Sequence, residues 1–144
     1  MILVDTTILV YAVGADHHLR VPCRALLEGV RDGRVRACTT VEVVQEFTHV
    51  RSRRRARSEA VARAREYALG LSPLVLPDDD DLARGLDIFE TTDRLGPFDA
   101  VLAAAALRRS WALASADQAF GDVDGLLHVD PSSPTFLEDV AAAG

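Results

Sequence analysis

Residues 1–12 read MILVDTTILVYA, and this stretch decides the fold. Asp5 lies between two copies of Ile-Leu-Val, separated from the second copy only by Thr6 and Thr7. The pattern predicts a buried strand at 2–4, a polar turn, and a short helix at 8–13 capped by Thr6 or Thr7. An acid between two apolar runs is poorly placed to be a solvated surface charge. Its alternative role is that of an Asx-turn or helix cap.

The remainder of the chain alternates short apolar runs with helical patterns. We predict further strands at 35–38, 74–76, 112–115 and 127–129, and further helices at 19–32, 41–53, 58–69, 78–92, 99–109 and 135–143. Alternation of this kind favours βα crossovers and a sheet covered on both faces. We therefore expect a single α/β domain over residues 1–144, with three α/β/α layers and a short, mostly parallel central sheet.

Three further acids occupy positions where a surface role explains them poorly. Glu46 lies in VEVVQEF, on the flank of an apolar helix face, whereas Glu42 points further away and is expected to be exposed. Asp99 is predicted to open a helix, DAVLAAAAL, that is apolar on all sides and therefore buried. Asp117 follows the strand of WALASAD. A helix-boundary charge, a helix cap and a turn residue are the respective alternatives.

The four acids together predict a metal site. In an open α/β sheet, functional groups gather beyond the carboxyl ends of the strands, where Asp5 and Asp117 are expected. Clustered carboxylates repel one another and take up protons unless a cation compensates them. Hard oxygen ligands favour Mg²⁺ or Mn²⁺ over zinc. We expect Asp5, Asp99 and Asp117 to bind the metal, with Glu46 binding directly or through water.

The basic residues restrict the alternatives further. All 16 are arginine, so a Walker A loop and lysine Schiff-base chemistry are excluded. The net charge of −6 argues against non-specific polyanion binding. Five arginines nevertheless cluster in one short run and are the candidate RNA-binding residues: Arg51, Arg53, Arg54, Arg55 and Arg57. A solvated helix end or a protein-binding surface is the alternative for this run.

Composition favours a cytoplasmic protein. Cys23 and Cys38 form neither a C-x-x-C motif nor a Cys/His cluster, and we expect them to be reduced core thiols. No apolar run is long enough to span a bilayer, so no membrane association is expected. The N-terminus has no basic leader and is a poor signal peptide.

The order and spacing of the four acidic motifs resemble PIN-domain ribonucleases, and specifically VapC-type toxins of toxin–antitoxin pairs. The matching segments are VDTTILVYA, TTVEVVQEF, FDAVLAAAAL and SADQAF, which together extend over almost the whole chain. Two departures are Thr7, where Asn or Ser is usual, and Ser115, where Thr is common. Both keep a polar side chain.

The resemblance implies a Mg²⁺- or Mn²⁺-dependent endoribonuclease in which Asp5, Glu46, Asp99 and Asp117 are catalytic. Water activated by the cation would attack the phosphodiester bond. Thr6 or Ser115 would hold the carboxylates by hydrogen bonds. The resemblance also implies a VapB-type antitoxin that blocks the site. A homodimer is expected as well, with the apolar helices near both ends of the chain as one source of its surface.

Other functions remain open at this point. A PIN-type nuclease could act on another nucleic acid, or the domain could be an inactive binding module. A phospho-acceptor domain or a haloacid-type phosphatase would need a lysine, which the chain lacks. The sequence does not determine whether Glu42, Asp93 or Asp122 assists the four acids.

Overall fold

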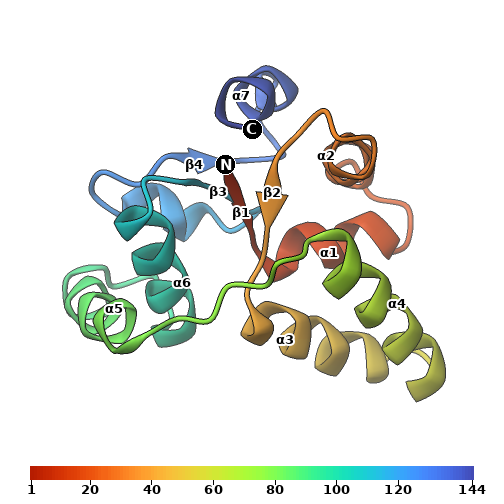
Figure 1. Ribbon diagram of the computed structural model, residues 1–144, viewed down its shortest axis with the longest axis horizontal. Helices are drawn as coiled ribbons and strands as arrows, with labels where there is room; N and C mark the ends of the chain where they lie inside the picture. Colours follow the sequence, from red (N-terminus) through yellow and green to blue (C-terminus); the bar gives the residue numbers. More distant parts are fainter.

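The computed structural model describes residues 1–144 and contains one central parallel sheet (Figure 1). Its four strands have the order β2-β1-β3-β4. Their bounds are Ile2–Val4 (β1), Ala37–Cys38 (β2), Ala112–Ala114 (β3) and His128–Val129 (β4). Strand β1 is fully buried, as its continuous apolar sequence predicted. It pairs with both β2 and β3, so the residues that follow these strands meet at one edge of the sheet.

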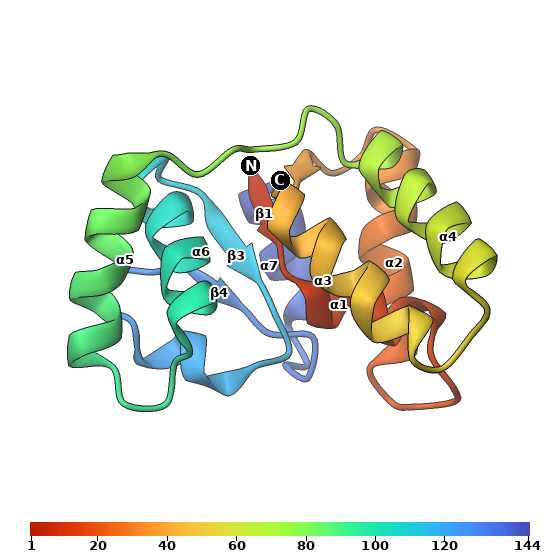
Figure 2. The same cartoon turned by 90° about the horizontal axis from the view of Figure 1, so that it is seen from below.

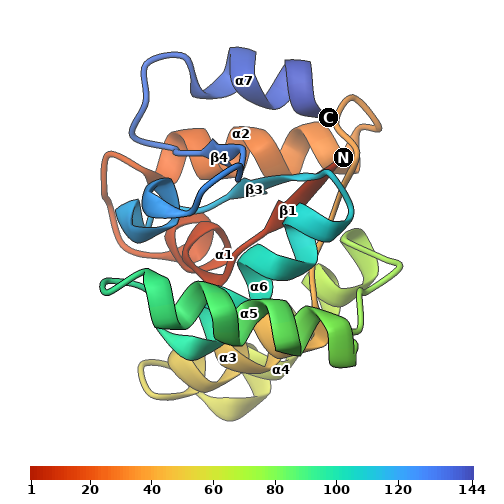
Figure 3. The same ribbon diagram turned by 90° about the vertical axis from the view of Figure 1, so that its left-hand side faces the viewer.

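Helices cover both faces of this sheet, which confirms the three-layer α/β/α prediction. Their bounds are Thr6–Val13 (α1), Arg20–Arg31 (α2), Val41–Ser52 (α3), Arg57–Gly70 (α4), Asp79–Thr91 (α5), Pro97–Arg108 (α6) and Phe136–Ala143 (α7). Figure 3 shows α2 and α7 on one side of the strands, and α3 to α6 on the other. None of these helices has the length and apolar character needed to cross a membrane.

Two predictions about local structure were wrong. Residues 74–76 do not form a strand, because only a single bridge joins Val75 to Thr40. Helix α1 begins at Thr6, and its cap is Asp5 rather than either threonine. By contrast, Thr40 caps α3 as predicted, with its hydroxyl accepting the Val43 amide at 3.2 Å.

Helices α5 and α6 form a tightly joined pair that Figure 2 shows side by side at one end of the molecule. A Cβ atom at Gly85 would lie only 2.7 Å from the Val101 backbone, so glycine permits this close approach. Asp81, fully buried, accepts hydrogen bonds from Arg108 at 2.6 Å and Arg109 at 2.9 Å. The structural role of Asp81 is therefore to fasten α5 to α6.

Candidate active site

Asp5 lies directly after β1 and is 3% exposed. Its Oδ2 atom accepts three hydrogen bonds, from the Thr7 amide at 3.2 Å, the Thr7 hydroxyl at 2.7 Å and the Ser115 hydroxyl at 2.7 Å. Because all three donors bind Oδ2, the Oδ1 atom is left available to a ligand. Asp5 is therefore both the helix cap and a fixed, buried carboxylate at the edge of the sheet.

Thr7 and Ser115 connect the ends of β1 and β3. The Thr7 hydroxyl accepts the Ala116 amide at 2.9 Å, and the Ser115 hydroxyl accepts the Asp117 amide at 3.0 Å. The two hydroxyl oxygens lie 3.2 Å apart. The sequence pointed to Ser115 but missed Thr7 as a supporting residue. An Asp side chain commonly accepts the backbone amide two residues on, and this Asx-turn signal could have pointed to Thr7.

We predict that Thr7→Val lowers RNA cleavage roughly 10- to 100-fold, the usual cost of removing a partner that orients a functional carboxylate. Valine keeps the shape of threonine but removes the hydroxyl that holds Asp5 and receives the Ala116 amide. Initial rates on a labelled RNA measure the effect. Thr7→Ser retains the hydroxyl and is the matched control, so equal rates in the two variants would contradict the assigned role.

Glu46 was predicted on the flank of the apolar face of its helix, and in the structure it is an exposed residue of α3. The Thr6 hydroxyl donates to its Oε2 atom at 2.7 Å and holds it beside the start of α1. Glu42 is exposed as predicted, yet Glu42 and His49 line the same cleft as Glu46. The hydrogen bond from Thr6, and not the helix face, is what distinguishes Glu46.

Asp99 was predicted to be the first residue of its helix, but it is the third residue of α6. Gly96 is the cap of this helix and Pro97 is its first residue. Burial, and after it the nearby charges of Asp5, Glu46 and Asp117, together raise the pKa of the Asp99 carboxyl to about 6. The Gly96 amide opposes this shift. The four predicted acids are thus close enough to influence one another electrostatically.

Asp117 is exposed and caps a short 3₁₀ helix, Gln118–Asp122, by accepting the Ala119 amide at 2.9 Å. Its turn role and its contribution to the acidic site are therefore compatible. Asp93 and Asp122 are also exposed, and Asp122 lies 3.5 Å from Arg94. Neither of these two acids lines the cleft described next.

Three of the four predicted acids, all except Asp117, border a cleft of about 710 Å³ between α3 on one side and α5 and α6 on the other. Asp5, Glu46 and Asp99 line it, and no arginine does. None of the four acids forms an ion pair with an arginine or histidine. Their negative charge is therefore uncompensated by the protein, which is the condition that a cation would relieve.

The donor set fits a hard divalent cation, since it consists of carboxylate oxygens with one oxygen of Asp5 unused. No three acidic, histidine or cysteine side chains are arranged as a ready-made metal site, however. Uncompensated carboxylates repel one another, so a cation would have to draw its ligands together. The selection of Asp5, Asp99 and Asp117 as the ligands stays a prediction.

The arginine run is divided by the structure. Arg51 forms an ion pair with Glu59 at 2.7 Å and also donates to the Val13 carbonyl, so its guanidinium is already engaged. The other four members are exposed, three in the turn between α3 and α4 and the last at the start of α4: Arg53, Arg54, Arg55 and Arg57. These four remain candidates for RNA contact.

Both cysteines match their prediction. Cys23 and Cys38 are buried and free. Burial raises the pKa of Cys23 to about 12 and that of Cys38 to about 11, so neither is a reactive thiolate at neutral pH.

Comparison with known proteins agrees with this geometry. The PIN domain family model matches residues 2–126. The chain is 50% identical to Ribonuclease VapC7 of Mycobacterium tuberculosis, across 92% of this chain and 93% of that protein. It is 35% identical to VapC ribonuclease Mb1869c of Mycobacterium bovis and to Ribonuclease VapC13 of Mycobacterium tuberculosis, across 90% of each chain. The chain therefore belongs to the PIN-domain family and, within it, to the VapC-type ribonucleases.

Proposed function

We propose that the chain is an endoribonuclease toxin that hydrolyses RNA phosphodiester bonds with Mg²⁺ or Mn²⁺ at Asp5, Glu46, Asp99 and Asp117. The observation that carries the proposal is the mutual influence of these four carboxylates without any cationic partner from the protein. Its relatives are named ribonucleases, and ribonucleases of this family generally depend on a divalent metal.

Asp5, Asp99 and Asp117 would hold the cation, with Glu46 as a direct or water-mediated ligand. When bound, a divalent cation makes water easier to deprotonate and stabilises the charge that develops on a phosphodiester. No amino-acid nucleophile is required for this chemistry.

The residues around these carboxylates keep them in place. Three donors fix Asp5 Oδ2, which holds the carboxylate in one orientation at the cleft that it lines. Thr6 fixes Glu46, which can then orient the attacking water or accept its proton. The raised pKa of Asp99 gives this carboxyl the same capacity near neutral pH.

The names of the relatives support an RNA substrate and a VapB-type antitoxin as partners. A cleft in which acids outnumber basic residues, with no arginine in its lining, would attract a cationic side chain of such an inhibitor. A homodimer and a cytoplasmic location stay predictions. The terminal helix α7 buries Phe136 and Val140 within the domain, whereas its Leu137 is 52% exposed.

Sequencing of RNA ends after brief induction of the protein tests the proposed function. New ends at defined sites are expected with the wild-type chain, and none with Asp5→Asn. Identical ends in both cultures would contradict it. Parallel assays with single-stranded DNA test whether the chain is a nuclease for another nucleic acid. Calorimetric titration with Mn²⁺ tests whether the domain is a catalytically inactive binding module, which would bind no metal.

The exposed arginines at the α3–α4 turn are expected to contact RNA phosphates. We predict that Arg54→Ala combined with Arg55→Ala weakens RNA binding and lowers the salt slope of log K by about 1.4, since each phosphate contact to a single strand contributes about 0.7. Binding measured between low and moderate salt gives this slope.

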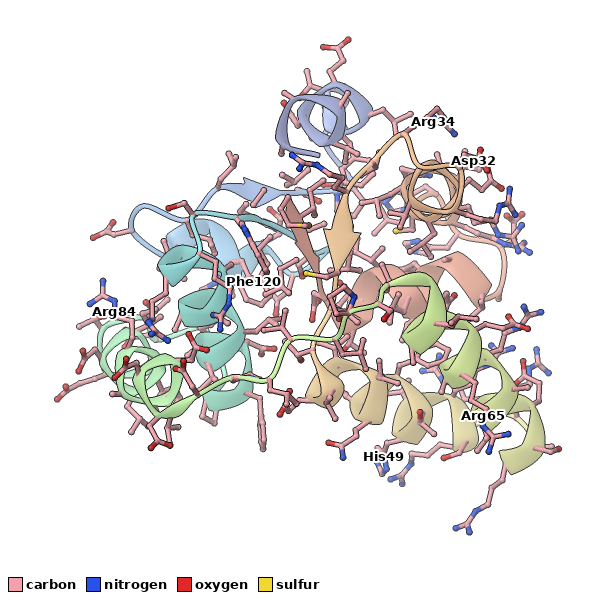
Figure 4. All side chains as sticks on the ribbon, viewed as in Figure 1. Asp32, Arg34, His49, Arg65, Arg84 and Phe120 are labelled. Atoms are coloured by element: carbon pink, nitrogen blue, oxygen red, sulfur yellow. The ribbon has the colours of Figure 1, made fainter.

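Arg31→Ala combined with Arg34→Ala is the matched control. These two arginines are also exposed but pair with Asp32. Figure 4 shows Arg34 near Asp32, in the turn that follows α2. The same slope change in both double variants would indicate only a general charge effect. An unchanged slope after substitution of Arg54 and Arg55 would assign their surface to another partner.

A further inference from the structure

The acidic cleft has an apolar wall that the hydrolytic chemistry does not use. Leu82 and Leu86 of α5 and Phe98 of α6 line it and are 50%, 53% and 82% exposed. Single exposed apolar residues are common on protein surfaces, but three on one wall of a cleft are typical of a binding site. Phe98 is the most exposed large hydrophobic residue of the chain.

We propose that this wall is a nucleobase subsite, in which an unpaired base of the RNA stacks on the ring of Phe98 while its phosphate lies at the carboxylates. Leu82 and Leu86 would contact the edge of the base or its sugar. The inference rests on the proposed function and adds to it a residue that positions the substrate.

The position of Phe98 in the chain supports this subsite. Phe98 directly precedes Asp99, so their Cα atoms lie about 3.8 Å apart. Both residues also line the cleft, so a phosphate at Asp99 would have its nucleoside within reach of the aromatic ring. The cleft volume of about 710 Å³ lies within the range typical of small-ligand sites, about 300–1,000 Å³, and can accept a nucleotide with its base.

The charges of the cleft indicate why base contact is needed. The lining includes Asp5, Glu42, Glu46 and Asp99 but no arginine, and His49 is its one basic side chain, so acidic groups outnumber basic groups there. Stacking on an aromatic side chain does not depend on charge, and it tolerates any base because every base has a π face. It is thus the attraction for RNA that this cleft can offer besides the bound cation.

A second copy of the chain is a less favourable occupant of the same wall. A twofold contact places the same patch of both copies face to face. Here it would bring two uncompensated acidic clefts together in a protein whose net charge is −6, which is electrostatically unfavourable. A single-stranded RNA accompanied by a divalent cation has no such penalty.

Fluorescence of 2-aminopurine tests the stacking directly. The probe is a short RNA that the wild-type chain cleaves, with 2-aminopurine on either side of the cleaved bond, bound to the Asp5→Asn variant so that it stays intact. We expect quenching at one of the two positions, its loss when Phe98→Ala is added, and its recovery with Phe98→Tyr. Phe89→Ala is the matched control, because Phe89 is 45% exposed on α5 but does not line the cleft.

The second readout is the kinetics of RNA cleavage by chains that keep Asp5 and are therefore active. Phe98→Ala should raise KM roughly 5- to 100-fold, the usual range for loss of one base stack, with a smaller change in kcat. An RNA that lacks the base at the quenched position should remove the difference between wild type and Phe98→Ala, because the two changes delete the same contact.

Each outcome has a distinct meaning. Unchanged fluorescence and KM in Phe98→Ala, with a wild-type chain that cleaves RNA, would overturn the subsite alone. If Phe98→Ala leaves KM unchanged but converts a dimer to a monomer in sedimentation, the subsite is also overturned. That result would assign the apolar wall to contact with a second copy of the chain. A wild-type chain that cleaves no RNA would overturn the proposed function, and the subsite with it.

Discussion

Asp5→Asn is expected to lower RNA cleavage by roughly 10³-fold or more while leaving the fold intact. The substitution removes the negative charge of the most buried acid of the site, which is the one whose free oxygen is available to a cation. An asparagine oxygen can still accept hydrogen bonds from Thr7 and Ser115, so the cap of α1 is retained. Cleavage of a labelled RNA across a series of Mn²⁺ concentrations measures the loss.

A matched substitution separates the site from general charge effects. Asp87→Asn changes an exposed acid of α5 that lies outside the cleft. This variant should cleave RNA at the wild-type rate. Thermal unfolding and far-ultraviolet circular dichroism of both variants should resemble the wild type. Substantial cleavage by a folded Asp5→Asn variant would remove Asp5 from the metal site and with it the main support for the proposed mechanism.

The central sheet could be predicted because its signals are local. Three apolar residues before Asp5 and three before Ser115 are sufficient to mark β1 and β3, whose parallel pairing then brings their ends together. The region at 74–76 carried the same apolar signal, flanked by prolines. It forms only one bridge, to Thr40, since the strand β2 that would pair with it is only two residues long.

The site was less predictable than the fold because its decisive contacts cross long separations. The bond from Thr6 to Glu46 joins residues 40 positions apart, and the bond from Ser115 to Asp5 joins residues 110 apart. A helical wheel describes one helix and could not show that Glu42 and His49 share a cleft with Glu46. For the same reason the ion pair between Arg51 and Glu59 could not be found from the arginine run alone.

The second large effect concerns Asp99, where function and stability are expected to oppose each other. Its pKa is raised from 3.8 to about 6, first by burial and then by Asp5, Glu46 and Asp117. Between these two values the folded chain retains a proton that the unfolded chain has lost. Stability contributed by the protonated form is therefore complete below pH 3.8 and is lost as the pH rises through about 6.

Asp99→Asn should consequently abolish cleavage and yet stabilise the fold above pH 6. We expect a gain on the order of 1–2 kcal/mol at pH 7.5, reduced from the full linkage value because the side chain is partly exposed, or about 3–6 °C in unfolding temperature. The gain should disappear near pH 4. Unfolding of both proteins by calorimetry from pH 4 to 8 measures it, with Asp93→Asn, an exposed acid just before α6, as the control.

Addition of Mn²⁺ completes the test of Asp99, because a cation that binds the native state relieves the same repulsion. Mn²⁺ should raise the unfolding temperature of the wild type at pH 7.5. The increase should be smaller for Asp99→Asn, because this variant lacks one of the proposed metal ligands. The increase should shrink toward pH 5, where protons compete with the metal for the Asp99 carboxylate. Equal stabilisation of both proteins by Mn²⁺ at every pH would place the bound cation away from Asp99, although Asp99 could still carry the stability change on its own.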